Sequence, residues 1–369
     1  MTDCEDAGAL AASASSSPPI RRVAVLGVGL IGGSVAVAAR RRLGAHVTGW
    51  DPDREALGHA LAAGVLDEPA DSVAAAVSGA DVAVVAAPVA ALVPTVQAVL
   101  GEAGRDCAVT DVGSTKRAVV AACADERYIG GHPLVGAEAS GVAHARPGLF
   151  EDATWYLTPT SATSGVLLER VNRFVAGLGA RPAHVDAATH DRLMAAASHL
   201  PHVVANVLVD HVAESLGGET LPPTGPGFRD ATRVAGANPA LWAQIYDANR
   251  EALLESLDDA LARLGRVRDE LAAGSDLLAW QAEAGARRRA LLEVGLTGGP
   301  RTELRVAVPN RPGVVADLAL TLARAGINIS DMSLGPAADG TSGVVALWVA
   351  QDAAERARGL VADLGFAVT

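Results

Sequence analysis

Residues 23–34 read VAVLGVGLIGGS, and this stretch decides the fold of the first half of the chain. The short apolar run Val23–Leu26 leads directly into a glycine-rich turn, and an alanine-rich helical pattern follows. A second apolar run, His46–Trp50, ends at Asp51, nineteen residues after Gly32. A strand, a glycine turn, a helix, a second strand and an acid in this order are typical of a dinucleotide-binding unit.

Each glycine of the turn has a physical role in such a unit. Gly27 permits the tight turn, Gly29 lets the backbone approach a pyrophosphate, and Gly32 lets the helix pack closely on the strand. The N–H groups at the start of the helix, around Leu30 and Ile31, would then face the phosphates. A glycine-rich turn in an α/β domain that binds no nucleotide is the alternative.

Asp51 decides which dinucleotide we expect. Its carboxylate would accept hydrogen bonds from a ribose diol, and it would repel a 2′-phosphate. The sequence therefore predicts NAD rather than NADP as the cofactor, although Arg54 nearby could soften this preference.

The bulk composition bounds what the chain can be. With 369 residues, half of them hydrophobic, it is long enough for two or three domains that each bury a core. The net charge of −12, without a block of basic residues, argues against nucleic acid and anionic membranes as partners. Cys4, Cys107 and Cys123 are scattered, so we expect reduced thiols in the cytoplasm rather than disulfides or a zinc site.

Two local segments have simple interpretations. The composition of residues 1–20 predicts a disordered tail. Prolines interrupt the uncharged stretch 82–100, which argues against a membrane span.

Three regions differ in their apolar pattern. Between residues 21 and 187, short apolar runs alternate with helical patterns, which predicts an α/β, Rossmann-type doubly wound sheet that binds NAD. From 188 to 297, long apolar-periodic segments predict an all-helical domain whose apolar faces need a partner, hence a homodimer. From 298 to 369, the βαββαβ order predicts a small ligand-binding module. The expected strands are 23–26, 46–50, 82–86, 107–111, 127–130, 154–157 and 183–185 in the first region, and 302–308, 327–334, 342–350 and 366–368 in the third; the expected helices are 193–216, 239–265 and 266–292 in the second region, and 313–325 and 352–364 in the third.

The segment DVGSTK, residues 111–116, follows one of the predicted strands. Ligands of a doubly wound sheet bind outside the carboxyl ends of its strands, so we expect Ser114 and Lys116 at the cofactor crevice. Lys116 is the only lysine among 30 lysine and arginine residues, which suggests a need for a compact ammonium group. Chance is the alternative for Lys116, and a helix N-cap is the alternative for Ser114.

The segment GGHPLVGAE, residues 130–138, follows the next predicted strand. His132, between a glycine and a proline, cannot lie in the middle of a helix. We expect it on a rigid loop, one strand away from Ser114, where it would act as a positioned base. A structural loop histidine is the alternative.

Two further motifs lie in the predicted helical domain. SHLPH places His199 and His202 on one helical face, where they would line a cleft for an anionic substrate. Core or surface histidines are the alternative, and no third residue stands at a spacing suited to a metal ion. In GFRDATR, Asp230 would orient Arg233 to bind a carboxylate bidentately, or the two would form only a surface ion pair.

Taken together, these segments resemble the prephenate/arogenate dehydrogenase family. The matching pieces are GVGLIGGS, DVGSTK, GGHPLVGAE, SHLPH, GFRDATR and NPALW, and they follow the family's order from residue 21 to about 295. The C-terminal region, with PNRPGV at 309–314 and GINI at 326–329, resembles an ACT domain. The resemblance covers everything except the N-terminal tail.

The resemblance implies the NAD-dependent oxidative decarboxylation of prephenate to 4-hydroxyphenylpyruvate and CO2, a step of tyrosine biosynthesis. His132 would accept the proton of the ring C4 hydroxyl, Ser114 would orient that hydroxyl, and Lys116 would lend positive charge. Arg233 would bind a substrate carboxylate. The further expected substrate ligands are His199, His202, Glu138 and Trp242.

Two positions depart from the family's pattern. Ala137 stands where many relatives have threonine, which removes one hydroxyl contact with the substrate. Asn310 stands where regulatory relatives often have aspartate, although an asparagine can still bind an α-amino acid. Tyrosine is the expected effector of the ACT-like module, and a purely structural module is the alternative. The residues expected to hold the effector are Asn310, Pro312, Gly313, Asn328 and Ile329.

Other functions share parts of this pattern. An arogenate dehydrogenase is the nearest rival, and an aminodeoxyprephenate dehydrogenase is another. A β-hydroxyacid or imine reductase shares the N-terminal glycine turn, but it typically carries lysine or aspartate where this chain has His199 and His202. A non-catalytic sensor of NAD and amino acids would not need Ser114, His132 and Arg233 together.

Overall fold

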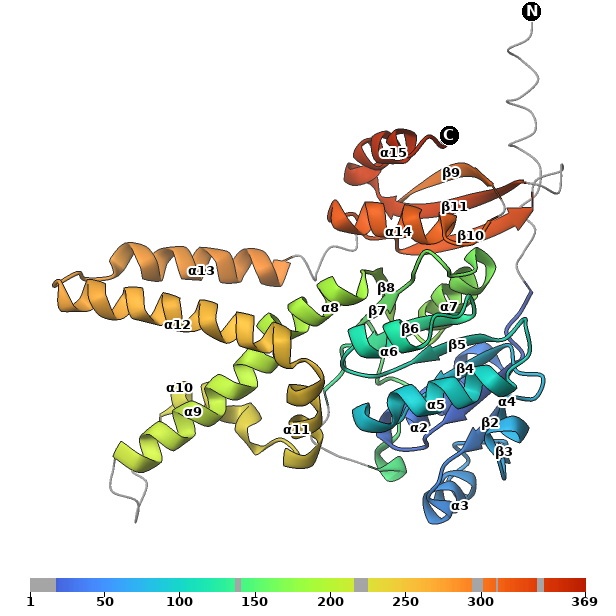
Figure 1. Ribbon diagram of the computed structural model, residues 1–369, viewed down its shortest axis with the longest axis horizontal. Helices are drawn as coiled ribbons and strands as arrows, with labels where there is room; N and C mark the ends of the chain where they lie inside the picture. The colour runs from blue at the N-terminus through green and yellow to red at the C-terminus, as the bar shows by residue number, and fades with distance from the viewer. Residues whose placement is uncertain (1–17, 137–140, 216–224, 294–300, 310, 337–341) are drawn as a thin grey trace, which may run out of the picture. The chain divides into compact units, whose positions relative to one another are not determined.

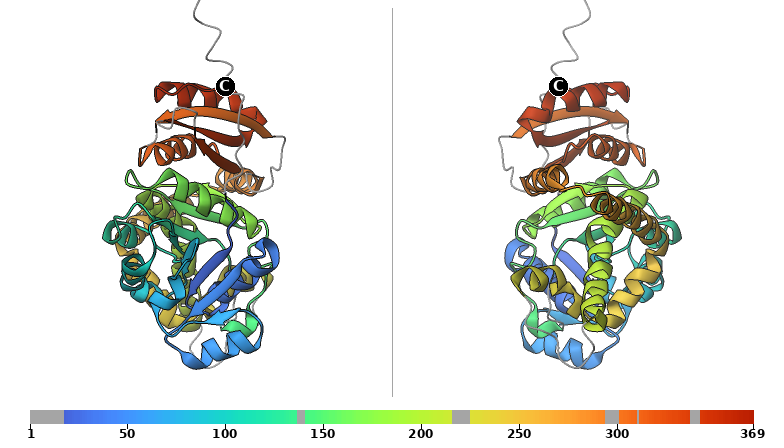
Figure 2. Two further views of the ribbon diagram at one scale, coloured as in Figure 1. Left: turned by 90° about the vertical axis from the view of Figure 1, so that its right-hand side faces the viewer. Right: turned by 90° about the vertical axis from the view of Figure 1, so that its left-hand side faces the viewer.

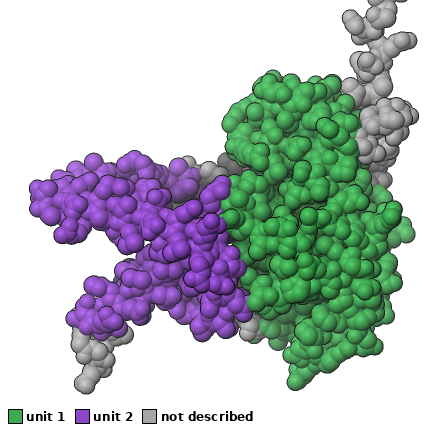
Figure 3. Space-filling view, in the orientation of Figure 1, with its two compact units in different colours: residues 1–191, 301–369 green, residues 192–300 purple. Residues whose placement is uncertain are grey.

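The computed structural model describes residues 18–136, 141–215, 225–293, 301–309, 311–336 and 342–369. They form two compact units (Figure 3). The nucleotide-binding unit comprises the chain up to residue 191 together with residues 301–369, and the helical unit comprises residues 192–300. The predicted NAD-binding and ACT-like domains therefore belong to one unit. Of the predicted tail, residues 1–17 lie outside the described residues.

The first strand shows how a short apolar run serves both faces of a sheet. β1 (Arg22–Leu26) is buried after its first residue. Val23 and Val25 join one apolar core, whereas Ala24 and Leu26 join another, because successive side chains of a strand point to opposite faces. A strand buried on both faces needs helices on both, which is the doubly wound architecture.

Eight strands form the main sheet, in the order β3-β2-β1-β4-β5-β6-β7-β8. Neighbouring strands are parallel except β6 and β7, which pair antiparallel. The strand order changes direction between β1 and β4, the position at which such sheets bind ligands. The remaining strands are β2 (His46–Trp50), β3 (Glu68–Pro69), β4 (Val82–Val85), β5 (Ala108–Asp111), β6 (Tyr128–Pro133), β7 (Thr154–Thr158) and β8 (Arg181–His184).

Helices cover both faces of this sheet (Figures 1 and 2). Apolar side chains of α2, α3 and α7 belong to one core, and those of α4, α5 and α6 belong to the other. The predicted Rossmann-type sheet is thereby confirmed. The helices are α2 (Leu30–Ala38), α3 (Arg54–Ala62), α4 (Val73–Val77), α5 (Val89–Glu102), α6 (Arg117–Ala122) and α7 (Gly165–Gly177).

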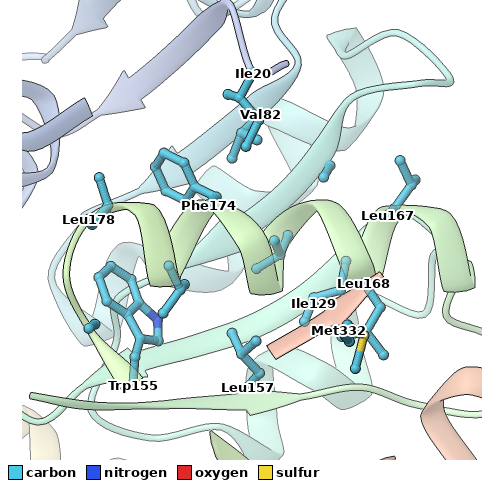
Figure 4. Packing of buried hydrophobic residues seen from close by; sticks show 14 of the residues in the cluster. Ile20, Val82, Ile129, Trp155, Leu157, Leu167, Leu168, Phe174, Leu178 and Met332 are labelled. Carbon is cyan, nitrogen blue, oxygen red and sulfur yellow. The ribbon is translucent and has the colours of Figure 1, made fainter. Parts of the chain in front are cut away.

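The C-terminal module packs on α7. Met332 of its edge strand and Leu168 of α7 lie in one continuous core (Figure 4). Its antiparallel sheet has the order β10-β11-β9. The strand expected at 366–368 is reduced to one bridge, between Val306 and Val368. The elements are β9 (Arg301–Pro309), α14 (Val314–Arg324), β10 (Asp331–Pro336), β11 (Ser342–Ala350) and α15 (Ala354–Asp363).

The helical unit contains only helices among its described residues, as predicted. The helix break expected at Gly265 is wrong, because α12 runs through this residue, where a glycine costs only about 1 kcal/mol. The helix ends instead just before Gly274, which has a φ of +85°. The elements are α8 (Ala187–Met194), which begins in the other unit, a π-helical turn (Ala195–His199), α9 (Leu200–Ser215), α10 (Pro226–Thr232), a 3-10 turn (Arg233–Gly236), α11 (Pro239–Ala248), α12 (Arg250–Ala272) and α13 (Leu278–Glu293).

Helix α12 exposes a stripe of large apolar side chains. Leu254, Leu261, Leu264 and Leu271 are each more than half exposed in the single chain. Their spacing of seven, three and seven residues places them along one side of the helix. Such a stripe is typical of a surface that another protein chain covers. None of the helices in the described part of the chain is long and apolar enough to cross a membrane.

Candidate active site

The glycine turn after β1 has the geometry that a dinucleotide needs. Gly27 has a φ of +101°, and a Cβ atom there would lie 2.4 Å from the carbonyl oxygen of Ala86. A Cβ atom at Gly32 would lie 1.9 Å from the carbonyl oxygen of Gly27, so helix and strand are in close contact. Gly29, by contrast, has open space where a side chain would stand, which leaves room for a phosphate beside the start of α2.

Asp51 lies beside this turn, at the end of β2. Its Oδ2 accepts a hydrogen bond from the backbone N–H of Val28 at 2.7 Å, which holds the carboxylate where a ribose diol would bind. Arg54 donates to Asp71 Oδ1 at 3.0 Å and to the Asp71 carbonyl oxygen, so its guanidinium group is engaged with the segment that follows β3. Leu30 and Ile31 are half-buried in the first turn of α2. The residues present therefore fit NAD.

The carboxylate of Asp111, at the end of β5, organises the next two segments of the site. It is fully buried. Its Oδ1 accepts from the backbone N–H of Gly113 at 2.7 Å and pairs with the ammonium group of Lys116. Its Oδ2 accepts from the hydroxyl of Tyr128 at 2.5 Å and from the N–H of Gly131 at 3.1 Å. One carboxylate thus ties the turn after β5 to strand β6.

Lys116 differs from its expected setting, and the alternative that Ser114 is a helix N-cap is wrong. The Lys116 side chain is fully buried against Asp111, and burial lowers the pKa of its ammonium group while the carboxylate opposes this shift. The structure therefore favours a Lys116 side chain that pairs with Asp111 over one that contacts a bound substrate. Ser114 is half-buried and is not the N-cap of α6, which begins only at Arg117. The carboxylate of Asp191 provides the acceptors for the free backbone N–H groups at the start of α6. It accepts from the N–H groups of Lys116 and Arg117 at 2.7 and 2.9 Å.

His132 lies within strand β6, so the expectation of a loop is wrong. Antiparallel pairing with Tyr156 of β7 extends β6 through Pro133, beyond the residues that pair with parallel β5. Nδ1 of the half-buried His132 ring lies 2.9 Å from Nε2 of His190. Nδ1 of His190 lies 2.8 Å from Oδ1 of Asp191, and these two side chains are buried. The predicted base is therefore part of a chain of three side chains.

The helical unit brings the rings of His199, His202 and Trp242 into one cluster. The ring of His202 stacks on Trp242, with centroids 3.4 Å apart and planes 23° apart. The buried ring of His199 meets Trp242 edge-on at 5.9 Å, and its Nδ1 lies 3.1 Å from Nδ2 of Asn249. Burial, and then the nearby charge of Arg233, lower the pKa of His202. Helix α10 ends just before Arg233, so this arginine and Asp230 do not share one regular helix.

Sequence reasoning missed several members of these networks. His190 and Asp191 form an adjacent His–Asp pair near the start of a helix, which is a visible signal, but nothing local places them beside His132, 58 residues away. Tyr246 packs on Trp242 with centroids 5.5 Å apart. Its hydroxyl has no hydrogen-bond partner among the described residues.

Two predicted site residues and one departure lie outside the described residues: Glu138, Asn310 and Ala137. Among the residues that the structure describes, no three His, Cys, Asp or Glu side chains are grouped to hold a metal ion. Of the residues expected to hold an effector in the ACT-like module, Pro312 and Asn328 are exposed and Ile329 is buried in the core.

Gly313, the remaining expected effector residue, docks the module onto the nucleotide-binding domain. Its φ is +85°, and a Cβ atom there would lie 2.3 Å from the carbonyl oxygen of Ser161. Its N–H donates to the carbonyl oxygen of Thr163. The turn that precedes α14 is thus in backbone contact with the loop after β7.

These features define a class of protein, a dinucleotide-dependent dehydrogenase with a Rossmann domain, a helical domain and a small C-terminal module. Residues 35–184 match the family model described as prephenate dehydrogenase, nucleotide-binding domain; residues 186–278 match the dimerization domain of the same family, and residues 302–365 match the ACT domain. The prephenate dehydrogenase of Bacillus subtilis (strain 168) is 32% identical over 337 residues, covering 88% of this chain and 90% of that relative. The chain belongs to the prephenate dehydrogenase family, which confirms the resemblance.

Solved structures of similar proteins agree with this assignment. The prephenate dehydrogenase from A. aeolicus in complex with hydroxyphenyl propionate and NAD+ superimposes with a TM-score of 0.70 at 29% identity, over 75% of this chain and 100% of that one. The Synechocystis arogenate dehydrogenase superimposes with a TM-score of 0.65 at 29% identity, over 73% and 99%. The fold is therefore shared by enzymes named for two closely related substrates.

Proposed function

We propose that the protein catalyses the NAD-dependent oxidative decarboxylation of prephenate to 4-hydroxyphenylpyruvate and CO2. The observation that carries this proposal is the 32% identity to a prephenate dehydrogenase across 88% of the chain. The site agrees with it, because His132 lies near the carboxyl end of β6, on the same edge of the parallel strands as the glycine turn after β1.

The chemistry proceeds at the ring C4 of prephenate. NAD, when bound near the glycine turn, would supply the acceptor for the hydride that leaves C4. His132 accepts the proton of the C4 hydroxyl as its oxygen becomes carbonyl-like, and Ser114 orients that hydroxyl. The C–CO2 bond then breaks, its electron pair makes the ring aromatic, and the oxygen regains a proton. The protein's share is to orient the substrate and move this proton.

The helical unit supplies the groups that bind the substrate. Arg233 binds one of the two substrate carboxylates through charge-assisted hydrogen bonds. His199 and His202 add donors, and Trp242 packs nearby. The cluster of the three rings and the effect of the Arg233 charge on His202 support the assignment. Glu138 stays a predicted further ligand, and Lys116 acts on the site through Asp111.

Arogenate is the second candidate substrate, and the fold shared with the Synechocystis enzyme favours keeping it. It differs from prephenate by an amino group in place of the side-chain keto oxygen. Membership of the family favours both substrates over a β-hydroxyacid or imine reductase reaction. Aminodeoxyprephenate stays a further alternative.

Assembly and regulation complete the proposal. The leucine stripe on α12 and the match to a dimerization domain support a homodimer. The match to an ACT domain supports tyrosine as an effector. The scattered cysteines support a cytoplasmic location.

Steady-state assays of prephenate and arogenate, each with NAD and with NADP, test the proposed function. We expect the highest kcat/KM for prephenate with NAD. Turnover of arogenate alone would make arogenate the substrate. Turnover of neither compound would contradict the proposal. Calorimetry that finds no tyrosine binding to the intact protein would end the effector proposal.

A further inference from the structure

His190 is a buried histidine to which the proposed mechanism gives no role. It lies in α8, and Asp186 ahead of that helix accepts from the N–H and the hydroxyl of Thr189 at 2.9 Å each. The ring of His190 stands between two other side chains, with Nε2 at 2.9 Å from His132 Nδ1 and Nδ1 at 2.8 Å from Asp191 Oδ1. Because it is fully buried, it does not touch a bound substrate itself.

The direction of both hydrogen bonds follows from the chemistry of Asp191. Its carboxylate already accepts from the N–H groups of Lys116 and Arg117, and an ionised carboxylate can only accept. The contact with His190 is therefore a bond in which His190 Nδ1–H donates. A neutral imidazole has one donor and one acceptor nitrogen, so His190 Nε2 must accept. The donor to it is His132 Nδ1–H.

The neutral state of His190 has its own physical cause. Burial lowers the pKa of this imidazole, while the nearby charge of Asp191 opposes the shift. An imidazole without a proton on Nε2 is the form that can accept a hydrogen bond from His132.

We propose that His190 is a positioning residue, which together with Asp191 fixes His132 in its Nδ1–H tautomer and so presents Nε2 as the base. This inference rests on the proposed function, because His132 is the base only in that reaction. In the step itself, the O–H bond of the C4 hydroxyl breaks and an N–H bond forms at Nε2 of His132. The proton on Nδ1 stays in its bond to His190.

Two further contacts hold this arrangement in place. The ring of Tyr156 packs edge-on against His190 with centroids 5.6 Å apart, and Tyr156 is also the cross-strand partner of His132. Asp191 in addition holds the backbone of Lys116, two residues after Ser114. The same carboxylate thus positions the segment that carries Ser114 and, through His190, the ring of His132.

Two substitutions of His190 separate positioning from packing. Glutamine offers one amide donor and one carbonyl acceptor, so it can keep both hydrogen bonds, whereas leucine keeps neither. We expect His190→Leu to lower kcat between about 10-fold and 10⁴-fold, the upper value being the loss seen when the partner that sets the tautomer of a catalytic histidine is changed. KM for substrate should stay within about threefold, and His190→Gln should restore most of kcat. Equal losses in both variants would overturn the proposal.

His184→Leu is the matched control. His184 is also a fully buried histidine of the nucleotide-binding unit, but its two ring nitrogens have no hydrogen-bond partner among the described residues. Its replacement should leave kcat unchanged. If His184→Leu lowers kcat as much as His190→Leu does, general repacking explains the loss and the proposal fails.

A double-mutant cycle tests whether His190 acts through His132. In a His132→Asn background, His190→Leu should cause little further loss of kcat, because the ring that it positions is gone. A further loss as large as in the wild-type background would overturn the proposal.

The tautomer itself can be read without any turnover. In ¹⁵N spectra of histidine-labelled protein, with His132 assigned by its substitution, we expect a protonated Nδ1 and an unprotonated Nε2. A protonated Nε2 in the neutral ring overturns the inference even if prephenate is the substrate. The expected pattern in a protein that turns over neither prephenate nor arogenate would instead overturn only the proposed function.

Discussion

The nucleotide-binding unit and the helical unit hold their expected active-site residues in different ways. In the first, the buried carboxylates of Asp111 and Asp191 each bind several donors, and these bonds fix the segments around them. In the second, the rings of His202 and Trp242 stack, and the charge of Arg233 lowers the pKa of His202. Proton transfer needs atoms held within hydrogen-bond geometry, whereas binding an anion depends on charge and contact area. Buried carboxylates therefore hold the residues expected to do the chemistry, whereas aromatic packing holds the residues expected to bind the substrate.

Removal of the Asp111 carboxylate should disrupt the hydrogen-bond network of the nucleotide-binding unit and cause the largest loss of stability. Asp111→Asn leaves the buried ammonium of Lys116 without its counter-charge, which should lower the free energy of unfolding by about 3–5 kcal/mol. Urea unfolding of the intact protein measures this. Lys116→Met is the matched variant, and it should cost less, because Asp111 keeps three other donors. A raised KM for substrate in Lys116→Met would restore the expected contact of Lys116 with the substrate.

Loss of the proposed base should come next. His132→Asn should lower kcat by about two or more orders of magnitude, as the loss of a general base does, while NAD still binds. Steady-state kinetics and the quenching of protein fluorescence by NAD check the two parts. His59→Asn, an exposed histidine of α3, serves as the control and should keep full activity. Unchanged turnover in His132→Asn would make His132 a structural residue.

Substitution of a substrate-binding residue in the helical unit should change KM rather than kcat. Arg233→Ala removes a charge-assisted contact with a substrate carboxylate, so KM should rise roughly 10- to 100-fold with little change in kcat. Arg229→Ala, an exposed arginine on the preceding helix, is the control. If Arg233→Ala weakens only the binding of NAD, this arginine has been placed on the wrong ligand, and the contrast between the two units disappears.

His184 is buried like His190, but among the described residues its ring nitrogens have no carboxylate partner, whereas His190 bonds to Asp191. Burial lowers the pKa of the His184 imidazole to about 4. The unfolded chain, with a pKa near 6.5, binds this proton first as the pH falls, so unfolding becomes easier between about pH 6.5 and pH 4. At pH 5 the expected loss of stability from this one group is about 2 kcal/mol relative to pH 7.5.

Thermal and urea unfolding of His184→Leu at these two pH values measures that contribution. The variant should lose less stability than the wild type on acidification. An identical pH dependence in the two proteins would show that His184 is not buried in its neutral form.

Much of the fold and part of the site could be predicted from local patterns. The apolar run before Gly27 and the glycine spacing predicted the tight turn after β1, in which Gly27 lies against the backbone of Ala86. This was possible because strand alternation and a positive φ depend on only a few neighbouring residues. The order of the motifs predicted the family. The cluster of His199, His202 and Trp242 could be predicted in part, because His199 and His202 are three residues apart where the π-helical turn continues into α9.

The tertiary structure decided the rest. That Lys116 turns inward to Asp111, that His132 lies in a strand, and that His190 stands behind it all depend on how β5, β6, β7 and α8 pack. The sequence by itself determined the glycine turn, the apolar cores and the kinds of side chain available, since these follow from local sterics and periodicity. Which of those side chains became partners was left to packing between distant segments, because a hydrogen bond forms only where two groups meet within about 3 Å, whatever their separation along the chain.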